Sequence, residues 1–430
     1  MGGGLLAFLS LPSNTLTAPL HAVSDGRHHR MGQTLRDGGH QLPVQFSAAS
    51  SAPAPTPPRR STRTGLLLGL LGGAAVIAAL AITQVTSNLG YDSAASQYES
   101  AAEKTSSAKA QVRDDIAELR AATDAAGRVI SGGNQPIAVP DDVHAGLASA
   151  VEDGTAAASD ADGIVATDIP AVDPKPGWFW ELFGATSELE ERLRDVDALA
   201  DELVDASTDI EDARATVTES GVAVITTAGG AAPGFEGAHL SARAETVIAL
   251  RDAAAEATAA TAVDEDAATA YLALQDAAAQ VIATENEELA EKAGPLLDTR
   301  LEIEAFARSL APGVLLDFDW APVVSGAGYN GSMGGYTTWW WGEKGRATIA
   351  LSNSVAEQWP AVRSKALVAH EVGHAISVKC QSMYDSSTQD SIEKWATAWA
   401  ISMGYTDDAN GVWAYGYPPQ NYIDAAAGCR

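Results

Sequence analysis

Positive charge and cysteine are both scarce in this 430-residue sequence, which has 27 Lys and Arg against 56 Asp and Glu. The formal net charge is −29, and most of the acidic excess lies in residues 84–310. Because a nucleic-acid partner requires a basic face that neutralises phosphate, we expect no such partner. The two cysteines are Cys380 and Cys429. One pair in an otherwise cysteine-free chain favours a disulfide in an oxidising compartment, and two free thiols are the alternative.

Long apolar runs are scarce as well, apart from residues 65–83, which carry no charge and follow Arg59, Arg60 and Arg63. At about 1.5 Å per residue, a helix of this length spans the hydrocarbon core of a bilayer. The arginines place the preceding residues in the cytoplasm and the rest of the chain outside. We therefore predict a disordered cytoplasmic tail (1–64) and a single transmembrane helix (65–83). The alternative is a signal sequence cleaved near Ala81, which would release the chain as a secreted protein.

Residues 84–310 are rich in Ala, Asp and Glu and show the periodicity of helices. Apolar residues recur every seven positions at Leu189, Val196, Leu203, Ile210 and Val217. This spacing predicts a supercoiled helix, and it allows a homo-oligomer through the same segment. Glycine and proline predict breaks at residues 132–133, 170–177 and 229–237. We interpret residues 84–310 as an acidic helical stalk.

An aromatic cluster within this stalk spans residues 178–183. We interpret it as a hairpin tip that packs on a neighbouring element, and a loop that dips into the membrane is the alternative.

The composition changes at residue 311: alanine thins out, glycine increases, and eight of the ten tryptophans follow. Residues 311–430 are enough for a compact domain with its own core. Residues 347–352 alternate like a strand, and a helix is expected after Pro360. The predicted fold class is an α+β C-terminal domain on a mainly α-helical stalk, with one N-terminal transmembrane helix.

The pattern H-E-x-x-H occurs at His370, Glu371 and His374. Residues four apart lie on one face of a helix, so the two imidazoles can bind one metal ion. The glutamate beside the first histidine can then act as a base on a water molecule at the metal. We therefore predict His370 and His374 as metal ligands and Glu371 as the catalytic base.

A catalytic zinc usually takes three protein ligands, and residues 311–430 contain no further histidine. We choose Glu393 as the third ligand, because it begins a run with helical periodicity that can cross the motif helix. The other residues with suitable side chains are Cys380, Asp385, Asp390, Asp407, Asp408 and Asp424.

Residues 365–402 resemble the small bacterial HExxH zinc metallopeptidases of the gluzincin type. The resemblance rests on HEVGH at 370–374 and on EKWATAWA at 393–400. It implies that His370, His374 and Glu393 bind Zn²⁺ and that Glu371 is the general base. It also implies a zincin-like fold for the α+β domain at residues 311–430. The implied reaction is hydrolysis of peptide bonds by a metal-activated water, with a peptide or protein as substrate.

The predicted function is therefore that of a membrane-anchored, extracytoplasmic zinc metallopeptidase. The alternative is a non-enzymatic cell-envelope binding or scaffold protein with a coiled-coil stalk and a Trp-rich C-terminal domain. For the donor that stabilises an oxyanion, position alone suggests Tyr405, Tyr415 and Tyr417.

Overall fold

Helix α1, Thr64–Ser131, begins the described part of the chain. The computed structural model describes residues 64–132, 135–342 and 345–430, and side chains are considered from residue 73 on. The predicted tail therefore lies outside the described residues, apart from its last residue. Among the residues described, α1 from Gly73 onward is the one helix long and apolar enough to cross a membrane, and 6% of its most apolar stretch is buried. This confirms an apolar helix of spanning length, whereas the crossing itself stays a prediction.

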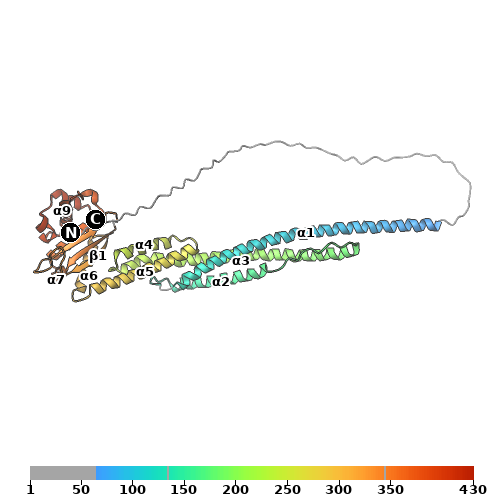
Figure 1. The fold of residues 1–430 in the computed structure, drawn as a ribbon, viewed down its shortest axis with the longest axis horizontal. Helices are drawn as coiled ribbons and strands as arrows, with labels where there is room; N and C mark the ends of the chain where they lie inside the picture. Colours follow the sequence, from blue (N-terminus) through green and yellow to red (C-terminus); the bar gives the residue numbers. More distant parts are fainter. Residues whose placement is uncertain (1–63, 133–134, 343–344) are drawn as a thin grey trace, which may run out of the picture. The chain divides into compact units, whose positions relative to one another are not determined.

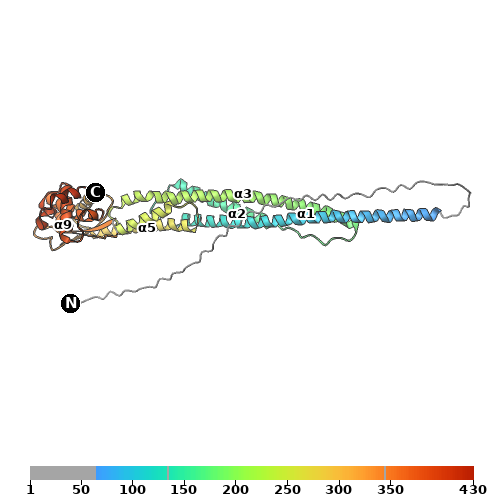
Figure 2. The same cartoon turned by 90° about the horizontal axis from the view of Figure 1, so that it is seen from above.

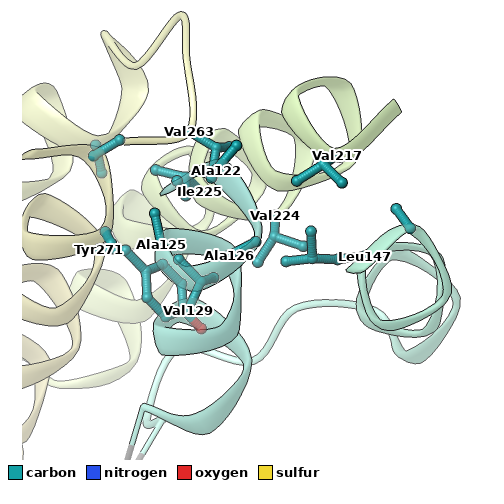
Figure 3. Packing of buried hydrophobic residues seen from close by; sticks show 14 of the residues in the cluster. Ala122, Ala125, Ala126, Val129, Leu147, Val217, Val224, Ile225, Val263 and Tyr271 are labelled. Atoms are coloured by element: carbon teal, nitrogen blue, oxygen red, sulfur yellow. The ribbon is translucent and has the colours of Figure 1, made fainter. Parts of the chain in front are cut away.

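Four further helices in residues 141–291 share a hydrophobic core with α1. They are α2 (Asp141–Val165), α3 (Phe179–Ala238), α4 (Ala244–Thr258) and α5 (Glu265–Glu291). Figures 1 and 2 both show α1 and α3 side by side, and Ser207 Oγ of α3 donates a hydrogen bond to Asp115 Oδ2 of α1 at 3.0 Å. Alanines and valines fill much of the space between the helices, as Figure 3 shows for Ala125, Ala126, Val129 and Val224, and Tyr271 of α5 packs with them.

The five heptad positions of α3 are all buried within this chain. Leu189 and Val196 pack with Tyr91 and Tyr98 of α1, and the later positions join the core of the bundle. A helix over these positions is thus confirmed, and its supercoiling stays a prediction. The apolar stripe that suggested a homo-oligomer is already covered inside one chain, and the oligomer stays a prediction.

Two of the three predicted helix breaks are present: α1 ends at Ser131, and residues 166–178 lie outside helices. The break predicted at residues 229–237 is wrong, because α3 continues through Pro233 to Ala238. Gly229 is small for a packing reason: an added Cβ would lie 2.5 Å from Thr258 Oγ1 of α4. The small residues therefore let two helices approach closely and do not end one.

The C-terminal part combines short helices with a small sheet. Its helices are α6 (Leu297–Leu310), α7 (Asn353–Glu357), α8 (Val362–Ser377), α9 (Gln389–Ser402), α10 (Val412–Tyr415) and α11 (Gln420–Ala426), with short 3-10 turns at Gln381–Met383 and Asp408–Asn410. Within the described ranges one sheet forms, from β1 (Leu315–Ala321), β2 (Gly335–Trp339) and β3 (Arg346–Ser352). The order is β1-β3-β2, with β1 parallel and β2 antiparallel to β3. The predicted strand and motif helix are both confirmed.

A second core lies between the sheet and helices α8 and α9. Phe318 and Ile349 of the sheet pack here with Trp395 and Trp399 of α9. Helix α6 precedes the predicted boundary at residue 311, yet its Ile303 is fully buried in this core. The observed fold is thus mostly helical with a small mixed sheet, as the α+β expectation required. The zincin-like fold stays a prediction.

Buried charges join the helical part to the sheet. Glu304 of α6 is fully buried and accepts hydrogen bonds from Lys292 Nζ and from Trp320 Nε1 of β1. Asp317 of β1 accepts a hydrogen bond from the backbone N–H of Ala244, at the first residue of α4. Removing one partner of such a network would leave an uncompensated charge, so it ties the last stalk helices firmly to β1.

Candidate metal centre

Helix α8 positions both histidines of the motif. Its sequence is apolar on almost every side, and residues 366–377 are buried without exception. The four-residue spacing places His370 and His374 on one face, as the motif requires. Their Nε2 atoms lie 3.1 Å apart.

Helix α9 brings the third residue of the site. Thr388 caps the start of α9 by accepting a hydrogen bond from the N–H of Ser391, and Glu393 follows just after the first turn. Helix α9 lies so close to α8 that a Cβ added to Gly373 would be 2.8 Å from the carbonyl oxygen of Ala396. Glycine at position 373 is therefore what allows the two helices to approach.

Three ligand atoms converge at this crossing. Glu393 Oε2 lies 3.2 Å from His370 Nε2 and 3.2 Å from His374 Nε2. Together with the 3.1 Å between the two nitrogens, these distances describe a nearly equilateral triangle. All three residues are buried, and their donor atoms could hold one metal ion. The sequence-predicted ligand set is thus brought together in space.

The carboxylate of Glu393 is held from its second oxygen. Gln389 Nε2 donates a hydrogen bond to Glu393 Oε1 at 2.6 Å, which leaves Oε2 for the two imidazoles. Burial alone would raise the pKa of Glu393, but the hydrogen bonds and charges of His370 and His374 outweigh it, and the pKa is lowered well below its usual range. The carboxylate is therefore ionised, as a metal ligand must be.

The two imidazoles are packed by neighbouring rings. The ring of Trp339, at the end of β2, stacks on His374 at 5.5 Å with an interplanar angle of 8°. The ring of Tyr415 lies over His370 at 6.0 Å and 13°. Thr397 Oγ1 is 3.4 Å from His370 Nδ1, whereas His374 Nδ1 is buried and has no hydrogen-bond partner among the described residues. Ring packing thus orients His374.

The side chain of Glu371 lies against β2. Thr337 Oγ1 lies 2.7 Å from Glu371 Oε2 and donates a hydrogen bond to it. Gly335 is so close that a Cβ there would lie 2.3 Å from Glu371 Oε1. Burial raises the pKa of Glu371, and the neighbouring His370 and the Thr337 hydrogen bond reverse only part of that rise. A carboxylate with a raised pKa is a stronger proton acceptor than one in water.

A cleft of about 470 Å³ opens in front of Glu371 and His370. The cleft is lined by Met333, which precedes β2, and by Gly335, the first residue of β2. Trp413 and Tyr415 of α10 line it as well. Burial and the nearby Glu393 carboxylate raise the pKa of Tyr415 to about 12, so the phenol stays protonated at neutral pH.

Of the three tyrosines singled out by position, Tyr415 is the one that lines this cleft. Tyr405 instead packs edge-on against Phe306 of α6. Tyr417 is 69% exposed and is not among the cleft residues.

Comparisons with protein-family models, with curated proteins and with solved structures found no match. Function therefore has to be inferred from the side chains of the site and their arrangement.

The other acidic residues considered for the third ligand have different partners. Asp385 accepts hydrogen bonds from Ser387, Asp390 pairs with Lys394 on the surface of α9, and Asp424 accepts a bond from Gln420. Asp407 accepts a bond from the N–H of Ala409, and Asp408 is exposed at the rim of the cleft. Glu393 alone among these candidates lies at the two histidines.

The predicted disulfide between Cys380 and Cys429 is confirmed, and Cys380 is therefore not a ligand. Cys380 follows α8 closely, and Cys429 follows α11, a helix that packs on α9. Trp399 Nε1 of α9 donates a hydrogen bond to the carbonyl oxygen of Cys429 at 2.9 Å. Ile423 and Ala426 of α11 are buried, so this end of the chain is packed. The disulfide thus holds the C-terminus close to α8 and α9, the two helices that carry the site.

Three supporting residues were not found from the sequence: Thr337, Gln389 and Trp339. Gln389 is four residues before Glu393 on a helix, and this i,i+4 spacing could have revealed it. Thr337 lies more than thirty positions before Glu371, and Trp339 lies more than thirty positions before His374, the residues that they contact. Only the pairing of β2 with β3 places them there, so no local pattern signals their role.

Proposed function

We propose that this chain is a membrane-anchored, extracytoplasmic zinc metallopeptidase that hydrolyses peptide bonds with Glu371 as general base. The observation that carries the proposal is the convergence of three buried ligand atoms beside a buried glutamate at the edge of a cleft. Structural sites rarely place such a base next to their ligands, because a purely structural ion needs none.

The residues present fit zinc in both size and chemistry. Four tetrahedral ligands at about 2.0–2.1 Å from zinc stand about 3.3 Å from one another. The observed spacings of 3.1 and 3.2 Å agree with one face of such a tetrahedron. His370, His374 and Glu393 would hold the ion and leave a fourth position free. Zinc bound there would polarise a scissile carbonyl and lower the pKa of a water molecule.

Glu371 moves the proton in this proposal. Its carboxylate takes a proton from the attacking water and returns it to the nitrogen of the departing amine. The raised pKa helps both steps, because the group accepts the proton more readily and is protonated when the amine leaves. The Thr337 hydrogen bond fixes one carboxylate oxygen and thereby the rotamer of the base.

Tyr415 is the donor we assign to the developing oxyanion. Its phenol is protonated at neutral pH, and its ring is held against His370 at the cleft. A neutral O–H placed in advance stabilises negative charge that appears during the reaction.

A peptide suits the shape of the cleft. β2 is an edge strand, and Gly335 of this strand lines the cleft beside Glu371. An extended peptide can pair with a free strand edge through its backbone, which would bring a scissile bond next to the base.

Two observations support the location outside the cytoplasm. The described part of the predicted span is apolar and exposed, and the C-terminal part carries a disulfide. Disulfides persist in oxidising compartments. An uncleaved anchor at residues 65–83 and release after cleavage near Ala81 both satisfy these observations, and we propose the anchored form because a long tail precedes the apolar run.

The test is hydrolysis of a peptide library by the full-length protein in lipid nanodiscs, loaded with zinc and read by mass spectrometry. The matched control is Glu371→Gln, which keeps the shape of the side chain and all three ligands. We expect cleavage by the wild type and loss of cleavage in the variant at equal zinc content. Equal cleavage by both would exclude Glu371 as the base. Bound zinc with no cleavage by the wild type would favour the scaffold alternative.

A further inference from the structure

Three large aromatic side chains stand exposed at the start of α3. Trp178, Trp180 and Phe183 are 60%, 56% and 56% exposed, whereas Leu182 between them is fully buried against α1. The rings of Trp178 and Trp180 stack on one another at 5.2 Å and 5°. We call these three residues the aromatic tip. Apolar side chains that gather at one exposed place mark a contact with something else.

An extended segment, residues 166–178, brings the chain to this place. It follows α2 and runs back along α1, because Lys109 of α1 bonds the carbonyl oxygen of Thr167 and Gln84 bonds that of Gly177. The 25 residues of helix between Gln84 and Lys109 measure about 38 Å. The ten residues from 167 to 177 reach at most about 36 Å when fully extended. The segment is thus extended, and the side chains of Gln84 and Lys109 span the remaining distance.

The extended segment is held to α1 along its length. The hydroxyl of Tyr98 donates to the carbonyl oxygen of Pro170, and that of Tyr91 donates to the carbonyl oxygen of Asp173 at 3.1 Å. Prolines at 170, 174 and 176 favour the extended backbone. The N–H of Phe179 then donates to Gln84 Oε1 at 2.9 Å. The aromatic tip is therefore fixed at the level of Gln84.

Gln84 is the first residue after the uncharged run of residues 65–83. Where α1 approaches this level, apolar side chains are exposed on opposite sides: Val76 and Val85 are nine residues, or two and a half turns, apart, and are 60% and 58% exposed. One protein partner would cover one face of such a helix. Lipid surrounds a helix on all sides, as this distribution requires.

We propose that the aromatic tip lies in the interface of the bilayer, between the headgroups and the acyl chains, on the side where the stalk emerges. Trp is favoured at this depth because its ring is apolar and its N–H stays hydrated. The proposal rests on α1 crossing the bilayer and is independent of the metal centre. The stalk then has two contacts with the membrane, the span and the tip, and the second restricts rotation about the first.

Both cysteines of the chain are in the disulfide, so a single introduced cysteine can be labelled selectively. Phe183, Leu80 or Val204 is replaced by cysteine, one at a time, in the full-length protein. Each variant is labelled without reductant with the polarity-sensitive dye NBD. The labelled protein is placed in nanodiscs whose lipids carry a doxyl quencher near the headgroup. Val204→Cys is the matched control, because Val204 is also an apolar, exposed residue of α3, at 63%. It lies about 30 Å further along the helix.

We expect the label at position 183 to emit at shorter wavelength and to be quenched by the doxyl lipid, and the label at 204 to report water. If the label at 183 reports water while the label at 80 reports lipid, the aromatic tip does not lie in the bilayer, although α1 crosses it. Water at both positions overturns both. If the blue shift at 183 disappears when each nanodisc holds one protein, a second copy covers the tip and the proposal is wrong.

Discussion

Replacing Gly373 by alanine tests whether the approach of α8 and α9 sets the metal site. The new Cβ would lie 2.8 Å from the oxygen and 2.9 Å from the Cα of Ala396. Carbon atoms in contact prefer about 3.5 Å or more, so the helices must separate by roughly 0.5 Å. Both contacted atoms belong to the backbone and cannot rotate away. Glu393 stands one turn before Ala396 on α9, and its oxygen would shift with the helix.

The effect on stability is small and the effect on metal binding is large. Overpacking costs about 1–3 kcal/mol, and alanine returns about 1 kcal/mol of helix propensity. The free energy of unfolding should therefore fall by no more than about 2 kcal/mol. Metal sites tolerate ligand displacements of roughly 0.2 Å, so we expect zinc affinity to fall about 10–100-fold.

The assay is competition for zinc against a chromophoric chelator, with the full-length protein in nanodiscs. The matched control is Gly163→Ala, at a helical glycine of α2 where an added Cβ meets no atom within 4 Å. It should leave zinc affinity unchanged and raise stability by about 0.4–1 kcal/mol. Unchanged zinc affinity in Gly373→Ala would show that the added Cβ does not displace Glu393 from the two histidines. The close approach of α8 and α9 would then not set the metal site.

Three further predictions concern the base, the bridge and the topology. Gly335→Ala should displace the Glu371 carboxylate, lowering the rate of peptide hydrolysis at unchanged zinc content, and full activity would exclude this contact. Opening the Cys380–Cys429 bridge, which spans 49 residues, should lower the free energy of unfolding of the C-terminal part by up to about 4 kcal/mol. Denaturant unfolding followed by tryptophan fluorescence, with and without reductant, measures this, and coincident curves would contradict it. External protease should remove residues 311–430 from intact spheroplasts, whereas protection would place them inside.

Sequence patterns predicted the features that depend on the spacing of residues within one helix or one segment. The spacing of His370 and His374 needs only one helix to bring them together, and Glu393 follows from the period of a second helix. The heptads of α3 predicted a buried stripe, although the sequence could not say that the same chain would cover it. Likewise, two cysteines in one segment predicted their own pairing.

Long-range packing decided the rest. Gly229 and Pro233 resemble a helix end in the sequence, yet α4 packs against this glycine and α3 continues. Thr337 reaches Glu371 only because β2 pairs with β3 on the far side from β1. Tyr415 could not be distinguished from Tyr405 by position, since the fold of residues 403–415 alone turns one toward the cleft and the other toward α6.

The central claim is that His370, His374 and Glu393 form one zinc centre. Zinc content per chain, measured after dialysis in the wild type, Glu393→Ala and Asp390→Ala, tests it most directly. Asp390 lies one turn before Glu393 on α9, and its side chain is 73% exposed and paired with Lys394. We predict one zinc per chain in the wild type and in Asp390→Ala, and a sharp loss in Glu393→Ala. Full zinc content in Glu393→Ala, or none in the wild type, would contradict the account.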